Sequence, residues 1–228
     1  KYFGYYSFKA RKSVKFIIID MYSPYVSLIQ KMFPNAQIII DTFHLVQLIS
    51  RSLNKTRICA MKSNKSAYNK MKRYWKLILK DRNELDYSKW KRYTCFSNLM
   101  TETDIVNYIL DQSVELKTTY YKYQELLQSI REKNYDNFIY AIDNVNNSIS
   151  DYMKTSIKTL TEFKDKIYNT FNNNYHNGFI EGNNNFIKVL KRIAFGFRSF
   201  RRFKTRIMIC KGLVKINKKK ANAFALAS

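Results

Sequence analysis

Two short apolar runs, each followed at once by an aspartate, most limit how this chain can fold. Residues 14–19 read VKFIII and lead to Asp20, and the stretch AQIII leads to Asp41. Runs this short, rich in β-branched residues and bounded by polar ones, predict buried strands. A strand buried on both faces ends at a rigid point, so each aspartate is expected at a well-fixed position. A loop acid after a strand is common, however, and the runs alone leave function open.

The segments after each strand predict helices. Ser23 is the expected capping residue, Pro24 suits the first helical position, and Pro34 stops that helix. Residues 42–58 continue with apolar side chains at helical spacing. Residues 14–58 therefore predict strand, helix, strand, helix, and the short connections favour a parallel, right-handed unit. In such sheets functional groups gather at the carboxyl ends of the strands.

Residues 59–170 have a different character. They contain no glycine and no proline, and charged residues alternate with aromatic ones. The periodicity predicts an all-helical module of about four helices. Trp75 and Trp90 lie among lysines and arginines, a pattern that also suits stacking on nucleic acid. We expect the two tryptophans to be anchors of the helical core, with stacking as the alternative.

The charge of the chain points to a polyanionic partner. Lys and Arg total 41 against 17 Asp and Glu, for a net charge of +24. Such an excess favours nucleic acid, because each neutralised phosphate releases condensed counterions. Apolar residues make up 46% of the chain, which excludes a disordered composition. No apolar run is long enough for a membrane span.

The basic residues concentrate after a polar loop at 171–178. A helix is expected from about Ile180, with one apolar stripe and one polar stripe. The apolar stripe holds Phe186, Leu190, Ile193 and Phe197, and the polar stripe holds Glu181, Asn185, Lys188 and Arg192. Between positions 181 and 220 there are thirteen Lys or Arg and one acid, Glu181. The helix macrodipole favours an acid near a helix start, so Glu181 also has a purely structural explanation.

Cysteine and histidine do not predict a metal site. Cys59, Cys95 and Cys210 are far apart, and His44 and His176 make no zinc-finger spacing with them. We expect three reduced thiols and an exposed His176. Carboxylates within a basic surface instead suit Mg²⁺, which takes hard oxygen ligands and keeps waters and substrate phosphate in its shell.

Two blocks of sequence resemble a known family. The segment IIIDMYSPYVSLIQKMFPNAQIIIDTFHLVQ and the segment HNGFIEGNNNFIKVLKRIAFGFRSFRRFKTRI are similar to DDE transposases of the ISL-three insertion-sequence family. The resemblance extends to about residue 213. It implies a ribonuclease H-like α/β catalytic core interrupted by a large all-α insertion. It also implies Mg²⁺- or Mn²⁺-dependent DNA cleavage and strand transfer at the ends of an insertion sequence.

Roles follow from the resemblance residue by residue. Asp20 matches the second catalytic acid and Glu181 the third, both as metal ligands, with Asp41 a lesser candidate for the second. Asp41 and His44 match a D-x-x-H pair that supports the site. Supporting positions around the glutamate are Gly182, Asn184 and Asn185. The residues expected to contact DNA are Lys188, Lys191, Arg192, Arg198, Arg201, Arg202 and Arg206.

One departure from the family concerns the first catalytic aspartate, which that family carries on an earlier strand. The chain is therefore expected to be a piece of a transposase, or a decayed copy, with a partial core and an incomplete two-metal site, inactive alone. The expected parts are a partial core at 1–58, a helical insertion at 59–170, a helical part with Glu181 at 171–213 and a basic tail at 214–228. Expected partners are DNA and further copies of the intact protein, in the cytoplasm of a bacterium near its nucleoid.

A second function from another class remains open. The basic helices alone would serve a non-catalytic scaffold that binds DNA or RNA, and the missing first acid favours it. Metal binding that depends on Asp20 and Glu181 discriminates between the two.

Overall fold

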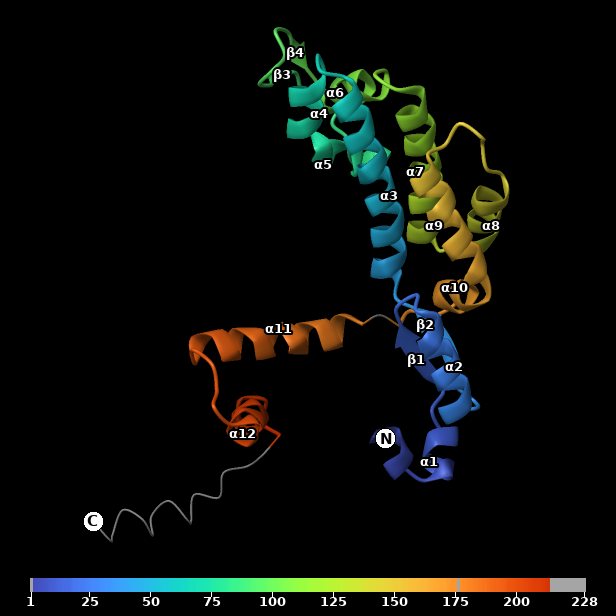
Figure 1. Cartoon of the computed structure of the whole chain (residues 1–228), viewed down its shortest axis with the longest axis vertical. Coiled ribbons are helices and arrows are strands. Elements are labelled where there is room, and N and C mark those ends of the chain that lie inside the picture. The colour runs from blue at the N-terminus through green and yellow to red at the C-terminus, as the bar shows by residue number, and fades with distance from the viewer. Residues whose placement is uncertain (1, 176, 214–228) are drawn as a thin grey trace, which may run out of the picture. The chain divides into compact units, whose positions relative to one another are not determined.

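A computed structural model describes residues 2–175 and 177–213 of the chain (Figure 1). The chain divides into two compact units, the first ending at position 176 and the second beginning at Asn177. Each unit is described by itself below. The predicted basic tail at 214–228 and His176 lie outside the described residues. Within the described part, every helix is too short or too polar to cross a membrane.

The first unit begins with the predicted alternation of strands and helices. Strand β1 (Phe16–Ile19) pairs in parallel with β2 (Gln37–Ile40), with Ile17 opposite Ile38 and Ile19 opposite Ile40. They are preceded by η1 (Tyr2–Tyr5) and α1 (Phe8–Lys12) and connected by α2 (Ser23–Met32). The predicted order is confirmed from residue 16 onward. The prediction of a buried strand is wrong for β1, whose four residues are half-buried, and holds for Ile38, Ile39 and Ile40 of β2. The prediction that Ser23 caps α2 is wrong. The cap position is Tyr22, and Ser23 is already helical.

A long helix connects this sheet to the helical module. Helix α3 (Thr42–Ser63) continues five residues past the predicted end at 58. Further along the chain come α4 (Tyr68–Arg73), α5 (Trp75–Ile78), η2 (Arg82–Glu84), α6 (Glu102–Leu110), α7 (Val114–Glu132), α8 (Tyr135–Asp143), α9 (Asp151–Glu162) and α10 (Lys164–Phe171). The predicted number of about four helices is thus too low. The breaks between these short helices contain no glycine or proline. Hydrophobic periodicity alone therefore does not show where one helix ends and the next begins.

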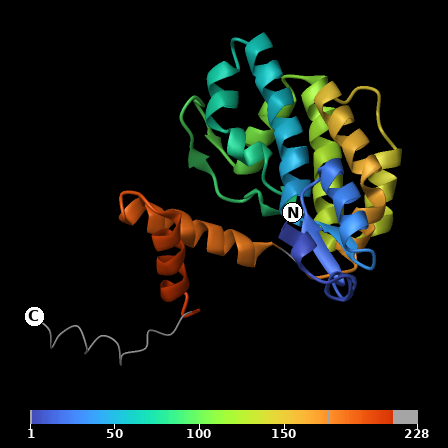
Figure 2. The same ribbon diagram turned by 60° about the horizontal axis from the view of Figure 1, so that its bottom comes forward.

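The core of the first unit lies between α3, α7 and α9, which run side by side (Figures 1 and 2). Its largest fully buried side chains include Tyr120, Tyr123 and Phe138. Apolar residues at helical spacing on α3, such as Leu45 and Ile49, have no exposed surface. Burying these side chains is the main favourable contribution to folding of the unit.

The module is not all-helical, which corrects the prediction. Strands β3 (Lys91–Arg92) and β4 (Leu99–Met100) form a short antiparallel hairpin. Trp75 and Trp90 are 37% and 62% exposed, so the prediction that they anchor the core is also wrong. Tyr74, the neighbour of Trp75, faces inward instead, and its ring lies 5.6 Å from that of Tyr93. The two tryptophans therefore do not lie on the side of their segments that packs against the core.

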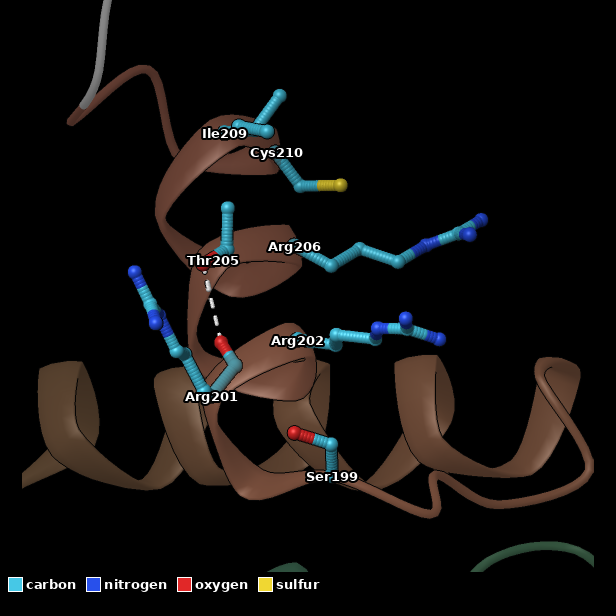
Figure 3. A pocket seen from close by; sticks show the side chains of 7 residues that line it. All are labelled: Ser199, Arg201, Arg202, Thr205, Arg206, Ile209 and Cys210. Atoms are coloured by element: carbon cyan, nitrogen blue, oxygen red, sulfur yellow. Dashed lines mark hydrogen bonds between the residues drawn. The ribbon is translucent and has the colours of Figure 1, made fainter.

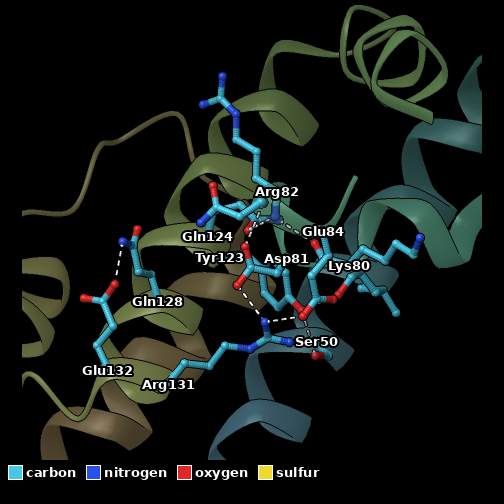
Figure 4. A network of polar contacts seen from close by, with 12 residues as sticks. Ser50, Lys80, Asp81, Arg82, Glu84, Tyr123, Gln124, Gln128, Arg131 and Glu132 are labelled. Carbon is cyan, nitrogen blue, oxygen red and sulfur yellow. Dashed lines mark hydrogen bonds and ion pairs between the residues drawn. The ribbon is translucent and has the colours of Figure 1, made fainter. Parts of the chain in front are cut away.

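A polar network fixes the segment before the hairpin onto α7 (Figure 4). Nη1 of Arg131 lies 2.8 Å from Oδ2 of Asp81 and 2.7 Å from Oε1 of Glu84. The amide of Gln124 donates to the carbonyl of Lys80 and accepts from the backbone N–H of Arg82. The end of α5 and the start of η2 are therefore held by side chains of one helix.

Helix α10 brings the chain back to the sheet. Oγ1 of Thr170 lies 2.9 Å from both the backbone nitrogen and the carbonyl oxygen of Ile40. The amide of Asn169 donates to the carbonyl of Ile38. These side chains satisfy the polar backbone groups along β2, which are buried and need partners. The helical module therefore leaves the sheet after β2 and returns to the same strand.

The second unit consists of two helices in the described residues, α11 (Gly178–Ile193) and α12 (Phe200–Cys210). Gly196 has a φ of +100° and its N–H bonds to the carbonyl of Lys191, which ends α11. A left-handed residue at this place favours glycine. Phe197 lies in the connection after α11, so the prediction that it belongs to the apolar stripe of this helix is wrong. Its ring packs against that of Phe203 on α12, with centroids 4.6 Å apart.

Candidate active site

Asp20 and Asp41 follow the carboxyl ends of two adjacent parallel strands. β1 ends at Ile19 and β2 at Ile40, and the backbone N–H of Asp41 donates to the carbonyl of Ile19 at 3.0 Å. The prediction that both aspartates stand at strand ends on one edge of the sheet is confirmed. This edge is where α/β sheets place their functional groups.

His44 contacts Asp20. Its Nε2 lies 2.7 Å from Oδ1 of Asp20, and the two side chains are 27% and 55% exposed. The contact is a hydrogen bond when the imidazole is neutral and an ion pair when it is protonated. It fixes one carboxylate oxygen of Asp20 against the first turn of α3. More than half of the carboxylate side chain stays accessible to solvent.

Asp41 has a different environment. It is 4% exposed and is the N-cap of α3, where its Oδ1 accepts from the backbone N–H of Phe43 at 3.2 Å. Capping satisfies one of the free N–H groups at a helix start. This geometry suits a residue that shapes the site. The imidazole of His44, the other member of the D-x-x-H pair, reaches Asp20.

The D-x-x-H spacing explains this outcome. In a helix that begins after Asp41, the backbone N–H of His44 bonds to the carbonyl of Asp41, here at 3.0 Å. The side chain of His44 is then free to reach across to the neighbouring strand end. The spacing of Asp20 and His44 in the sequence does not predict their contact, because the contact depends on the pairing of β1 with β2.

The first unit offers only some of the ligands that a divalent cation needs. Mg²⁺ prefers carboxylate oxygens and keeps several waters, so the accessible carboxylate of Asp20 suits it as one ligand. Among residues 2–175 and 177–213, however, no three His, Cys, Asp or Glu side chains gather closely enough to hold a metal ion. Asp20 therefore offers a ligand and does not form a complete site by itself.

Glu181 lies in the first turn of α11, in the second unit. Its backbone N–H bonds to the carbonyl of Asn177, and its side chain is exposed. A Cβ placed at Gly182 would meet nothing within 4 Å, so the surface beside Glu181 is open. Asn184 and Asn185 are exposed too.

The basic residues predicted to contact DNA all lie at the surface of the second unit. One group lies on α11 and the other on or just before α12, and every member is exposed: Lys188, Lys191, Arg192, Arg198, Arg201, Arg202 and Arg206. On α12, an open hollow of about 700 Å³ is lined by Arg201, Arg202 and Arg206 together with Thr205 (Figure 3). Arg202 and Arg206 project to the same side of the helix. On the apolar stripe of α11, Leu190 is buried and Ile193 is 65% exposed.

The sequence profile of one family of transposases matches residues 1–207. That match covers the strand ends, the helical module and both basic helices. The chain belongs to the ISL-three family of DDE transposases. The predicted family is therefore confirmed. The individual roles of Asp20, Asp41, His44 and Glu181 within this transposase remain predictions.

A curated relative shares part of the sequence. A Lactococcus lactis subsp. lactis protein named ATP-dependent protease is 42% identical over 113 residues, which is 50% of this chain and 36% of that protein. The matched part thus spans about a third of the relative's length. No solved structure matches the chain.

Proposed function

We propose that this chain contributes the second and third acidic residues of a transposase active site that cleaves and joins DNA strands with Mg²⁺ or Mn²⁺. Asp20 and Glu181 would each supply a carboxylate to the metal, which would supply charge stabilisation at the phosphodiester. The observation that carries the proposal is Asp20 itself. It is the exposed carboxylate at the end of β1, held by His44, within a chain of the transposase family.

The remaining residues have supporting roles in this proposal. His44 holds one oxygen of Asp20 and so orients the carboxylate, as outer-shell partners of metal ligands commonly do. Asp41 caps α3 and fixes the position of His44. The core would be of the ribonuclease H-like type, of which β1 and β2 represent two parallel strands.

DNA is the proposed substrate and partner. The exposed cations on α11 and α12 would neutralise phosphates, since this is the largest sequence-independent contribution to DNA binding. Arg202 and Arg206 are one helical turn apart and face the same way, which suits contacts to successive phosphates (Figure 3). Substrate ends and target DNA would be held by an oligomer of the intact transposase.

The name of the lactococcal relative does not suggest the function of this chain. ATP-dependent enzymes with a P-loop require the glycine-rich pattern G-x-x-x-x-G-K-[ST]. The five glycines of this chain stand at positions 4, 178, 182, 196 and 212 and do not form that pattern.

Metal titration tests the proposal. Mn²⁺ binding to the purified chain, followed by loss of the free-ion electron paramagnetic resonance signal, is expected to weaken at least tenfold in Asp20→Ala and in Glu181→Ala. The matched control is Asp151→Ala, because Asp151 is an exposed acid on α9 that pairs with Lys154. Mn²⁺ affinity unchanged by both active-site variants would favour the alternative, a non-catalytic scaffold that binds nucleic acid through its basic helices.

A further inference from the structure

The far end of the helical module carries two large aromatic side chains that the fold does not bury. Trp90 is 62% exposed and Tyr87 is 81% exposed. They stand with Lys89, Lys91 and Arg92 just before and within β3, and no acid occurs between Asp86 and Glu102. We call Tyr87, Lys89, Trp90, Lys91 and Arg92 the hairpin surface.

The turn that leads into Trp90 is fixed. Oδ1 of Asp86 accepts from the backbone N–H of Ser88 at 3.0 Å and from that of Lys89 at 2.9 Å. Asp86 is held in turn by Glu102, whose Oε2 accepts its backbone N–H at 3.2 Å. The same oxygen of Glu102 pairs with Nζ of Lys80 at 2.8 Å. Trp90 therefore projects from a segment bonded to the body of the module.

Other aromatic residues already anchor the hairpin. The Tyr74 hydroxyl donates to the carbonyl of Thr94 at 2.6 Å, and its ring lies 5.8 Å from that of Phe96. The Phe96 ring in turn packs edge-on against Tyr108 at 5.3 Å. Since these contacts attach the hairpin, folding makes no evident use of Trp90. Large exposed aromatic groups beside cations are typical of interaction sites.

Helices α4 and α5, next to the hairpin, add positive charge and no negative charge. The acids of α6, Glu102 and Asp104, are half-buried and bonded within the fold, Glu102 to Lys80 and Asp104 to Thr101. Between Asp41 and Asp81 the chain has ten Lys or Arg and no acid. Lys72, Arg73 and Lys76 from this stretch are exposed on α4 and α5, which lie with β3 and β4 at one end of the unit (Figure 1). Nζ of Lys76 lies 5.8 Å from the ring of Trp75. This end therefore suits a partner that is negatively charged and presents flat apolar faces.

We propose that the hairpin surface binds an unpaired DNA strand, with a base stacked on Trp90 and phosphates contacted by Lys89, Lys91 and Arg92. This inference rests on the proposed function, because it takes DNA as the substrate. Cations alone would suit a duplex. An exposed indole favours an unpaired strand, because the faces of its bases are free to stack on the ring. In a duplex, each base face is already covered by the neighbouring bases.

Tryptophan fluorescence tests the proposal directly, because the chain has two tryptophans and both lie at this end. In Trp75→Phe, the signal comes from Trp90 alone. We expect an oligothymidylate strand to quench it at saturation, and a duplex of equal length to quench it far less. We expect Trp90→Ala to weaken binding of the single strand about 5- to 150-fold, the range for losing one base–aromatic stack. Trp90→Phe should retain most of the affinity.

Tyr140→Ala is the matched control. Tyr140 is 67% exposed on α8, where the nearest charges in sequence are Asp136 and Asp143. Its loss should leave binding of the single strand unchanged. Circular dichroism of each variant confirms that it folds, as expected for side chains with this exposure.

Two contrary results have different meanings. If the chain binds DNA but Trp90→Ala binds single strands as well as the parent chain does, the inference is overturned and the proposed function stands. If the chain binds neither single-stranded nor duplex DNA, both are overturned. Equal quenching by an unrelated acidic polypeptide would assign the surface to a protein partner and overturn the inference as well.

Discussion

Nε2 of His44 lies 2.7 Å from Oδ1 of Asp20, and this contact joins the start of α3 to the end of β1. The two residues are 24 positions apart and meet because β1 and β2 are parallel neighbours. The exposed fractions of 27% and 55% indicate that the pair contributes little to stability. Its importance is the orientation of a carboxylate.

We therefore expect His44→Ala to affect metal binding more than folding. The free energy of unfolding in urea should change by less than about 1 kcal/mol. The affinity for Mn²⁺ should fall about tenfold, as is common when a partner of a metal ligand is lost. His44→Gln keeps a donor of similar reach and should recover much of the affinity. Equal affinities in the parent chain and His44→Ala would contradict the orienting role.

Thr170 should be important for joining the helical module to the sheet. Thr170→Val keeps the shape but leaves the buried N–H and C=O of Ile40 without their side-chain partner. We expect a loss of about 1–3 kcal/mol in the free energy of unfolding, the usual cost of such unsatisfied groups. Thr161→Val is the control, because Thr161 is exposed and bonds only within its own helix. A loss as small as that of the control would show that water replaces Thr170.

Tyr120 should make the protein sensitive to alkaline pH. Burial raises the pKa of Tyr120 to about 12, from an ordinary value of 10.0. The charge of Arg82 lowers the pKa of Tyr120, and Gln124 does so to a smaller extent. The amide of Gln124 is already bonded to the backbone of Lys80 and Arg82. The folded state holds the Tyr120 proton more tightly than the unfolded state does. This contribution to stability is therefore complete below pH 10 and is lost as pH rises from about 10 to about 12.

The size of this effect is about 2–3 kcal/mol, from a shift of about two units. Stability measured in urea from pH 9 to pH 11.5 checks it. The Tyr120 hydroxyl is buried without a hydrogen-bond partner among the described residues. Tyr120→Phe should therefore be as stable as the parent chain at pH 8, or more stable, and should lose less stability above pH 10. An identical alkaline profile in the variant would assign the loss to other groups.

Arg202 and Arg206 should contribute to DNA binding through charge alone. Each substitution by alanine should lower the slope of log affinity against log salt by about 0.9 for duplex DNA, the value for one phosphate contact. Binding should weaken to a similar extent for unrelated DNA sequences, because phosphate contacts carry no sequence information. Lys154→Ala is the control, since Lys154 is already paired with Asp151. Unchanged slopes in the arginine variants would place the DNA elsewhere.

The local sequence pattern was sufficient to predict those elements that are determined by residues close together in the sequence. The two apolar runs and their aspartates predicted β1, β2 and the edge at which Asp20 and Asp41 stand. Helical spacing likewise predicted the polar face of α11 with Glu181. These features depend on neighbouring residues, and the structure has the strands, their ends and the helix as expected, except that β1 is half-buried.

Other features depend on distant partners and could not be predicted from pattern. The hairpin of β3 and β4 is held by Tyr74, which lies far from Thr94 in sequence. The exposure of Trp90 follows from which aromatic rings pack beneath the hairpin. The bonds from Thr170 to Ile40 join residues 130 positions apart. No local periodicity encodes these contacts.

We propose that the carboxylates of Asp20 and Glu181 serve one metal site. Cross-linking measures whether they do, in a chain whose Cys59, Cys95 and Cys210 are changed to serine. With Asp20→Cys and Glu181→Cys, we expect a short bismaleimide to join the two positions within one chain. In the control, the second cysteine is placed at Arg192 and Glu181 is kept. Arg192 lies 11 residues further along α11, about 16 Å away. Asp20→Cys with Arg192→Cys should give no internal link. If Asp20→Cys with Glu181→Cys also fails to link, the two carboxylates do not share a site and the account is wrong.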